Sequence, residues 1–191
     1  MLDSHYCAES LPENNGFTWT LVSRLGAMLQ EVEGLYGWRD MSWTPIGVEF
    51  GPETPQLWFP GNCKNIAIQL APNARWDNVL ACYQLAHECV HLLAPDGRHG
   101  APVLEEGLAT VFSEDYIARN FNRSGLTNLQ SYADAATKVR QLLALNPDAI
   151  KALRQVEPCF KQMTASTFVA AGLHAAPDSL VNDLLTPFHR T

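Results

Sequence analysis

Two histidines and a glutamate near the middle of the chain have the types and the spacing of a metal site. His87, Glu88 and His91 form a His-Glu-x-x-His run inside a stretch with helical periodicity. On a helix, residues four apart project from the same side, so both imidazoles can reach one tetrahedral Zn²⁺ at ~2.0–2.1 Å. Glu88 lies between them in angle and suits a general base acting on a water whose pKa the metal lowers. The run therefore predicts zinc, bound by His87 and His91.

The third ligand must come from another element, and Glu106 is the best candidate. Residues 103–121 predict a second helix beyond a turn-rich loop, and Glu106 in its first turn would face the histidines if the two helices pack side by side. Two histidines, one glutamate and an open position are typical of catalytic zinc. Two alternatives stay open, namely Glu105 as the ligand in place of Glu106, and His99 as a further ligand from the loop.

Residues around this helix pair are candidates for supporting roles. Gly107 removes a side chain next to the ligand and would let the helices come close. Thr110 or Ser113, on the same face as Glu106, could accept the outer N–H of a zinc histidine. The group that stabilises the developing oxyanion is not evident, and the possible donors are Tyr116, Tyr132 and His174, each of which also has a purely structural interpretation.

The elements that must position these residues follow an α+β order. Residues 17–33 predict an amphipathic helix, and the aromatic, proline-rich stretch after it predicts a sheet of two to four strands, with pieces at 46–50, 56–59 and 65–70. The helices expected after residue 76 cover 76–93, 103–121, 127–145, 148–156, 159–171 and 178–186. We therefore expect a single domain over 1–191, with the sheet and metal helix at about 36–93 and a helical part at about 102–191.

Composition narrows the classes of partner. The 191 residues carry 13 Lys and Arg against 20 Asp and Glu, a net charge of -7 that argues against nucleic acid or an anionic membrane. No apolar stretch approaches the ~18 residues of a membrane helix, and the first residues do not resemble an export signal. Five irregularly spaced cysteines indicate reduced thiols and a cytoplasmic protein, with Cys82 and Cys89 on the apolar side of the metal helix.

The motif His87-Glu88-x-x-His91, followed by Glu106-Gly107-Leu108-Ala109, resembles the gluzincin metallopeptidases, and its short spacing resembles the small bacterial peptidase-MA-like domains. The resemblance covers residues 65–118. It implies a zincin-like fold, Glu106 as the third zinc ligand, and a peptide or protein substrate. In the resembled family the strand before the metal helix pairs with extended substrate, so the strand at 66–70 has two interpretations, a substrate-pairing strand or a core strand only. The chain departs from thermolysin-like members at Thr110, where they carry Asp.

Two hypotheses follow. The first is a zinc-dependent hydrolase, most simply a metallopeptidase in which Glu88 is the general base. The second is a non-catalytic zincin-like domain that keeps zinc for structure or binds a peptide or protein partner. A fourth ligand from a side chain such as His99 would favour the second. Trp38, Trp43 and Trp58 are expected either in the core of the small sheet or along a substrate pocket.

Overall fold

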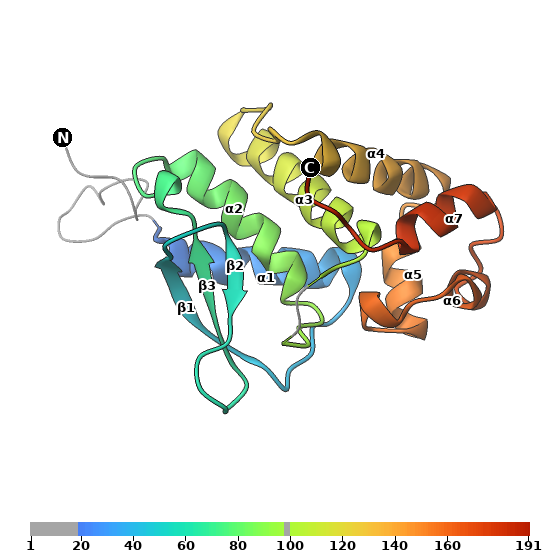
Figure 1. Ribbon diagram of the computed structural model, residues 1–191, viewed down its shortest axis with the longest axis horizontal. Helices are drawn as coiled ribbons and strands as arrows, with labels where there is room; N and C mark the ends of the chain where they lie inside the picture. Colours follow the sequence, from blue (N-terminus) through green and yellow to red (C-terminus); the bar gives the residue numbers. More distant parts are fainter. Residues whose placement is uncertain (1–18, 98–99) are drawn as a thin grey trace.

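The computed structural model describes residues 19–97 and 100–191 of the protein. Within these residues the chain is α+β, as predicted, with a small mixed sheet and seven α-helices (Figure 1). The elements are α1 (Leu21–Tyr36), β1 (Thr44–Phe50), β2 (Gln56–Trp58), β3 (Asn65–Leu70), α2 (Asn78–His91), α3 (Val103–Phe121), α4 (Gln130–Leu145), α5 (Ala149–Val156), α6 (Ala165–Ala170) and α7 (Asp178–Leu185).

Strand β3 is the centre of the sheet, which has the order β1-β3-β2. β1 runs parallel to β3 and β2 runs antiparallel to it. Ile66, Ile68 and Leu70 of β3 are fully buried, which is expected of a central strand. Of the two interpretations of this strand, the core strand is confirmed and the substrate-pairing strand is wrong, because β1 and β2 already occupy both of its edges. β2 is the edge strand on the other side from β1.

Helix α2 packs against β3, α1 and α3, so it connects the sheet with the helical half (Figure 1). Its start is fixed by Asp77, whose carboxylate accepts hydrogen bonds from two N–H groups of the first turn. Cys82, Leu85 and Cys89 are fully buried, as predicted for the apolar side of this helix. The four cysteines that lie in the described residues are free thiols.

Helix α3 packs on α2 along one side and on α4 along the other. Gly107 lies at the second of these contacts, because a Cβ at this position would collide with the backbone carbonyl of Ala135 and the side chain of Val139. The glycine therefore permits the close approach of α3 to α4. It does not serve the approach of α3 to α2 that the sequence suggested.

The last third of the chain packs on the ends of the earlier helices. The helix expected at 159–171 is interrupted, since Thr164 and Thr167 form a capping box that starts α6 anew. Arg154 of α5 is buried and donates to four backbone carbonyls at the ends of α1 and α2, those of Tyr36, Gly37, Trp38 and Leu93. This guanidinium satisfies polar groups that burial would otherwise leave unpaired.

The three tryptophans differ in burial, and Trp43 alone agrees with the expected core position, because it is partly buried and packs against the core. Trp38 is 83% exposed and Trp58 is 49% exposed, so neither belongs to the core. Trp43 packs edge-to-face on Phe59, with ring centroids 5.2 Å apart. None of the helices within 19–97 and 100–191 combines the length and the apolar character needed to cross a membrane.

Candidate metal centre

Helix α2 presents His87 and His91 on the side that faces α3. Their ring centroids lie 5.1 Å apart, as expected of residues separated by one helical turn. The buried residues on the other side of α2 set the rotation of the helix, so core packing aims the two imidazoles. The predicted helix carries the predicted histidines, and both of them face the same partner.

That partner is Glu106, in the first turn of α3. Its Oε2 atom lies 3.1 Å from Nε2 of His87, and its Oε1 atom lies 3.8 Å from Nε2 of His91. One ligand atom from each of the three residues falls within 4.8 Å of the others. The structure thus brings together the three residues that the sequence proposed as ligands.

Glu105 takes a different place from its neighbour. Its Oε1 atom lies 2.8 Å from Nδ1 of His91, so it contacts the ring nitrogen that Glu106 does not face. Glu105 therefore lies behind His91, in the position of a carboxylate that orients a metal-binding imidazole and fixes its tautomer. The geometry does not support Glu105 as the alternative ligand.

Thr110 and Ser113 do not have the supporting role suggested for them. The Thr110 hydroxyl donates to the backbone carbonyl of Glu106, and the Ser113 hydroxyl donates to that of Ala109. Both side chains satisfy carbonyls of their own helix, as buried hydroxyls commonly do. The sequence suggested Glu105 only as an alternative to Glu106. Its contact with His91 depends on the packing of α3 on α2, which the sequence does not show.

The electrostatics of the cluster suit a cation. Burial alone would lower the pKa of His91, but the carboxylates of Glu106 and Glu105 outweigh it and raise the pKa to about 10. Burial alone would raise the pKa of Glu106, but His91 and His87 lower it to about 2. Both shifts show that the two carboxylates favour positive charge in the place where the three candidate ligand atoms converge.

Glu88 lies beside the ligands but outside their cluster. It is only 4% exposed, and burial raises the pKa of its carboxyl group. It lines both of the cavities that adjoin the histidines. Glu88 is a buried carboxylate that faces a cavity beside the three candidate metal ligands. It is therefore placed to exchange a proton with a molecule bound in that cavity.

Of the three possible oxyanion donors, the structure brings one to the site. Tyr132, in the first turn of α4, stacks edge-on against His87 with ring centroids 5.6 Å apart, and it lines both cavities. Burial, followed by the nearby charge of Glu106, raises its pKa to about 12, so its hydroxyl stays a donor. Tyr116 is buried against Arg24, and His174 is exposed; neither lines these cavities. His99 lies outside the described residues.

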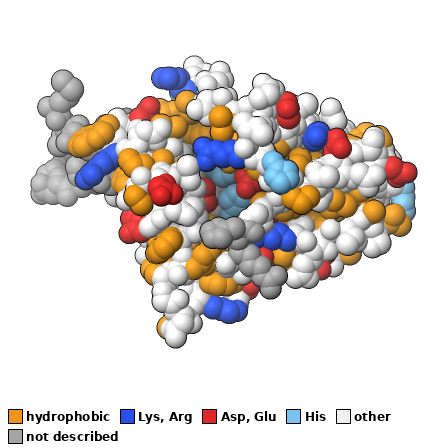
Figure 2. All heavy atoms as spheres, in the orientation of Figure 1, with side chains coloured by type: hydrophobic (Ala, Val, Ile, Leu, Met, Phe, Trp, Pro, Cys, Tyr) orange, Lys and Arg blue, Asp and Glu red, His pale blue; other side chains and the backbone are white. Residues whose placement is uncertain are grey.

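The two cavities share His87, Glu88 and Tyr132 in their walls, and together they are called the groove below. The larger, of about 480 Å³, extends from His87 and Glu88 past Tyr83 and Leu126. The smaller, of about 190 Å³, is lined by His91, Glu106 and residues of β2. Figure 2 shows histidine and acidic atoms in a hollow of this face, with a basic group above them.

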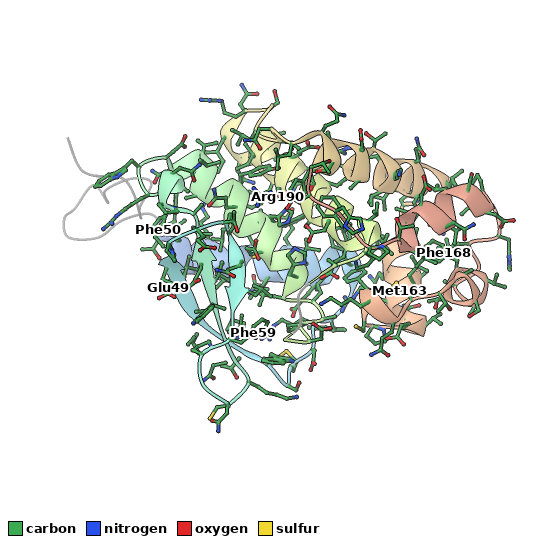
Figure 3. All side chains as sticks on the ribbon, in the orientation of Figure 1. Glu49, Phe50, Phe59, Met163, Phe168 and Arg190 are labelled. Atoms are coloured by element: carbon green, nitrogen blue, oxygen red, sulfur yellow. The ribbon has the colours of Figure 1, made fainter. Side chains whose placement is uncertain are left out.

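Arg190 is a residue of this groove that the sequence did not indicate. It lines the larger cavity together with His87 and Tyr132, although it lies far from both in the chain, and Figure 3 shows it above α2 and α3. No motif surrounds it, so the sequence contained no signal for its place. Only the path of the last residues over α3 and α4 brings it there.

The donor set fits a divalent ion. Two imidazole nitrogens and one carboxylate oxygen are ligands that Zn²⁺ accepts, although other transition metals accept them as well. Compared with known proteins, the chain matches no family model, no curated protein and no solved structure. The resemblance to gluzincins therefore stays a prediction that rests on the motif residues alone.

Proposed function

We propose that the protein is a metal-dependent hydrolase, most simply a zinc peptidase with a zincin-like fold related to the gluzincins. The observation that carries the proposal is the position of Glu88, a buried carboxylate that faces the groove directly beside His87, His91 and Glu106. A metal site that serves structure alone has no need of such a group.

Each residue of the site would have a distinct role in metal binding, orientation or proton transfer. His87, His91 and Glu106 would hold the ion. Glu105 would fix the orientation of the His91 ring by accepting a hydrogen bond from Nδ1. When bound, a divalent ion such as Zn²⁺ acts as a Lewis acid on a carbonyl and lowers the pKa of an attacking water. Glu88 would take the proton of that water at its carboxylate and return it to the leaving amine.

Tyr132 supplies the hydrogen-bond donor that the sequence did not identify with certainty. Its phenol lines the groove next to His87 and remains protonated. It would donate to the carbonyl oxygen of the substrate as negative charge develops there. Strand β2 lines the smaller cavity and provides a sheet edge along which an extended peptide could lie.

One observation favours a second candidate, a non-catalytic domain that binds a metal or a partner protein. His87 lies within hydrogen-bond distance of Glu106, and His91 lies within hydrogen-bond distance of Glu105. A cluster that is satisfied in this way can also stabilise the α2–α3 contact without any chemistry.

The two candidates are separated by metal analysis and by the variant Glu88→Gln. The proposed hydrolase binds one divalent ion per chain and cleaves members of a mixed peptide library. Glu88→Gln should keep the ion and lose activity by a factor of about 10²–10⁴. Glu49→Gln, an exposed site on β1, is the matched control and should leave both properties unchanged. Normal cleavage by Glu88→Gln would refute the mechanism, and metal binding without cleavage by the wild type would favour the second candidate.

A further inference from the structure

Arg190 is exposed and lines the larger cavity, and contacts on both sides of it in the chain fix its backbone. The backbone N–H of Phe188 donates to the carbonyl of Ala101 at 2.8 Å, and the Phe188 ring packs on Tyr132 with centroids 4.8 Å apart. On the other side, the backbone N–H of Thr191 donates to Ser131 Oγ at 3.2 Å, and Ser131 Oγ donates to the Thr191 carbonyl at 3.1 Å. These contacts place the backbone of Arg190 above the start of α4.

The guanidinium of Arg190 has no anionic partner within 4.0 Å among residues 19–97 and 100–191. The cation in the adjoining smaller cavity differs, because Lys161 is paired with Asp96 at 2.8 Å. Arg190 therefore lines the larger cavity without a direct ion pair to a described residue, and Glu106 is a carboxylate near enough to feel its charge. Arg190 lines the same cavity as His87, Glu88 and Tyr132.

We propose that Arg190 binds a carboxylate group of the peptide that occupies the larger cavity. The guanidinium is planar and offers paired N–H donors that match the two oxygens of a carboxylate. The carboxylate has two possible sources in a peptide, an Asp or Glu side chain near the reacting bond or the free C-terminus. The inference rests on the proposed function where it concerns which peptides are cleaved. The binding of peptides by Arg190 can be measured without any cleavage.

The other lining residues of the larger cavity suit a peptide that carries one carboxylate among apolar side chains. Its walls include Leu80, Leu126 and Leu129, which would receive apolar side chains. Glu53, exposed at the wall formed by the segment before β2, is an acidic residue of the same cavity. It makes no ion pair with Arg190 and provides a charge of opposite sign whose removal should not weaken binding of an anion.

The experiment uses three mixtures of hexapeptides built from the same neutral residues. The first has both ends blocked, the second has a free C-terminal carboxylate, and the third has blocked ends and one Glu side chain. Retention of each mixture is measured on metal-loaded Glu88→Gln protein and on the same protein carrying Arg190→Gln, Arg190→Lys or Glu53→Gln. Cleavage of the mixtures by proteins with Glu88 intact is measured in parallel, and Arg123→Gln is the control for loss of an exposed arginine outside this groove.

We expect the second or the third mixture to be retained better than the first by about tenfold, and the mixture that is favoured identifies the source of the carboxylate. Arg190→Gln should abolish that preference, Arg190→Lys should keep part of it, and the Glu53 and Arg123 variants should keep all of it. Equal retention of the three mixtures by the parent protein, or an equal loss for all three in Arg190→Gln, would overturn the inference. If retention depends on Arg190 but the protein cleaves none of the peptides, the inference about Arg190 is supported and the proposed hydrolase function is refuted.

Discussion

Nδ1 of His91 lies 2.8 Å from Oε1 of Glu105, while Nε2 of the same ring faces Glu106. Two adjacent glutamates at the start of α3 therefore lie next to different nitrogens of one imidazole, Glu105 next to Nδ1 and Glu106 next to Nε2. The nitrogen that faces Glu106 is the one that would bind the proposed ion. The other nitrogen keeps its hydrogen atom, which Glu105 accepts, and this fixes the tautomer of the ring.

The first prediction concerns Glu105. Glu105→Ala should lower the affinity for Zn²⁺ by about 10–100-fold, because His91 loses the carboxylate that orients it. Glu105→Gln keeps an oxygen that can accept the N–H of His91 and should lose less. Glu106→Gln, which alters a ligand, should lose more than either. Competition with a chelating dye measures all three, and an affinity of Glu105→Ala equal to the wild type would exclude the orienting role.

Tyr132 is the subject of the second prediction. Tyr132→Phe removes the phenol but keeps the ring that packs on His87 and Phe188. We expect kcat to fall by about 10²–10³ with little change in KM, since the hydroxyl would act on charge that develops during the reaction. Tyr116→Phe is the control, because that tyrosine lies outside the groove. Equal kcat values for the wild type and Tyr132→Phe would remove this residue from the mechanism.

The third prediction tests the close contact between α3 and α4. Gly107→Ala inserts a methyl group against the Ala135 carbonyl, and we expect it to destabilise the protein by about 1–3 kcal/mol. It should also disturb the groove, because Tyr132 lies one turn before Ala135 on α4. Gly26→Ala is the matched control in α1, where a Cβ has open space, and it should stabilise the fold by about 0.5–1 kcal/mol. Thermal or urea unfolding of both variants would show opposite signs; a loss of stability in both would contradict the packing argument.

The fourth prediction is a dependence of stability on pH in chelator-treated protein. Burial opposes the charged form of His91, but Glu106 and Glu105 outweigh it and raise the pKa to about 10, above the ~6.5 of an unfolded chain. A raised pKa contributes stability that is complete below pH ~6.5 and is lost as the pH rises through about 10. The melting temperature should therefore fall between pH 7 and 10 more steeply in the wild type than in His91→Gln. Parallel profiles for the two proteins would count against the charged pair.

The sequence was sufficient for the features that depend on local patterns. The strand at 65–70 and the helix at 103–121 have the predicted bounds, because each has a clear hydrophobic period and a proline or glycine turn before it. His87, Glu88 and His91 fall on one helix for the same reason. The helix at 159–171 was predicted too long, since the hydrophobic pattern continued through the cap at Thr164.

What only the tertiary structure decided concerns relations between elements. The order β1-β3-β2 places β3 in the middle of the sheet, and strand order depends on pairing across the chain, which a local pattern does not contain. The separate positions of Glu105 and Glu106 depend on the rotation of α3 against α2, and the selection of Tyr132 over Tyr116 depends on how α4 approaches α3 at Gly107. Arg190 reaches the groove because the last residues cross over α3 and α4. The chain by itself determined which side chains could do chemistry, and long-range packing determined which of them meet.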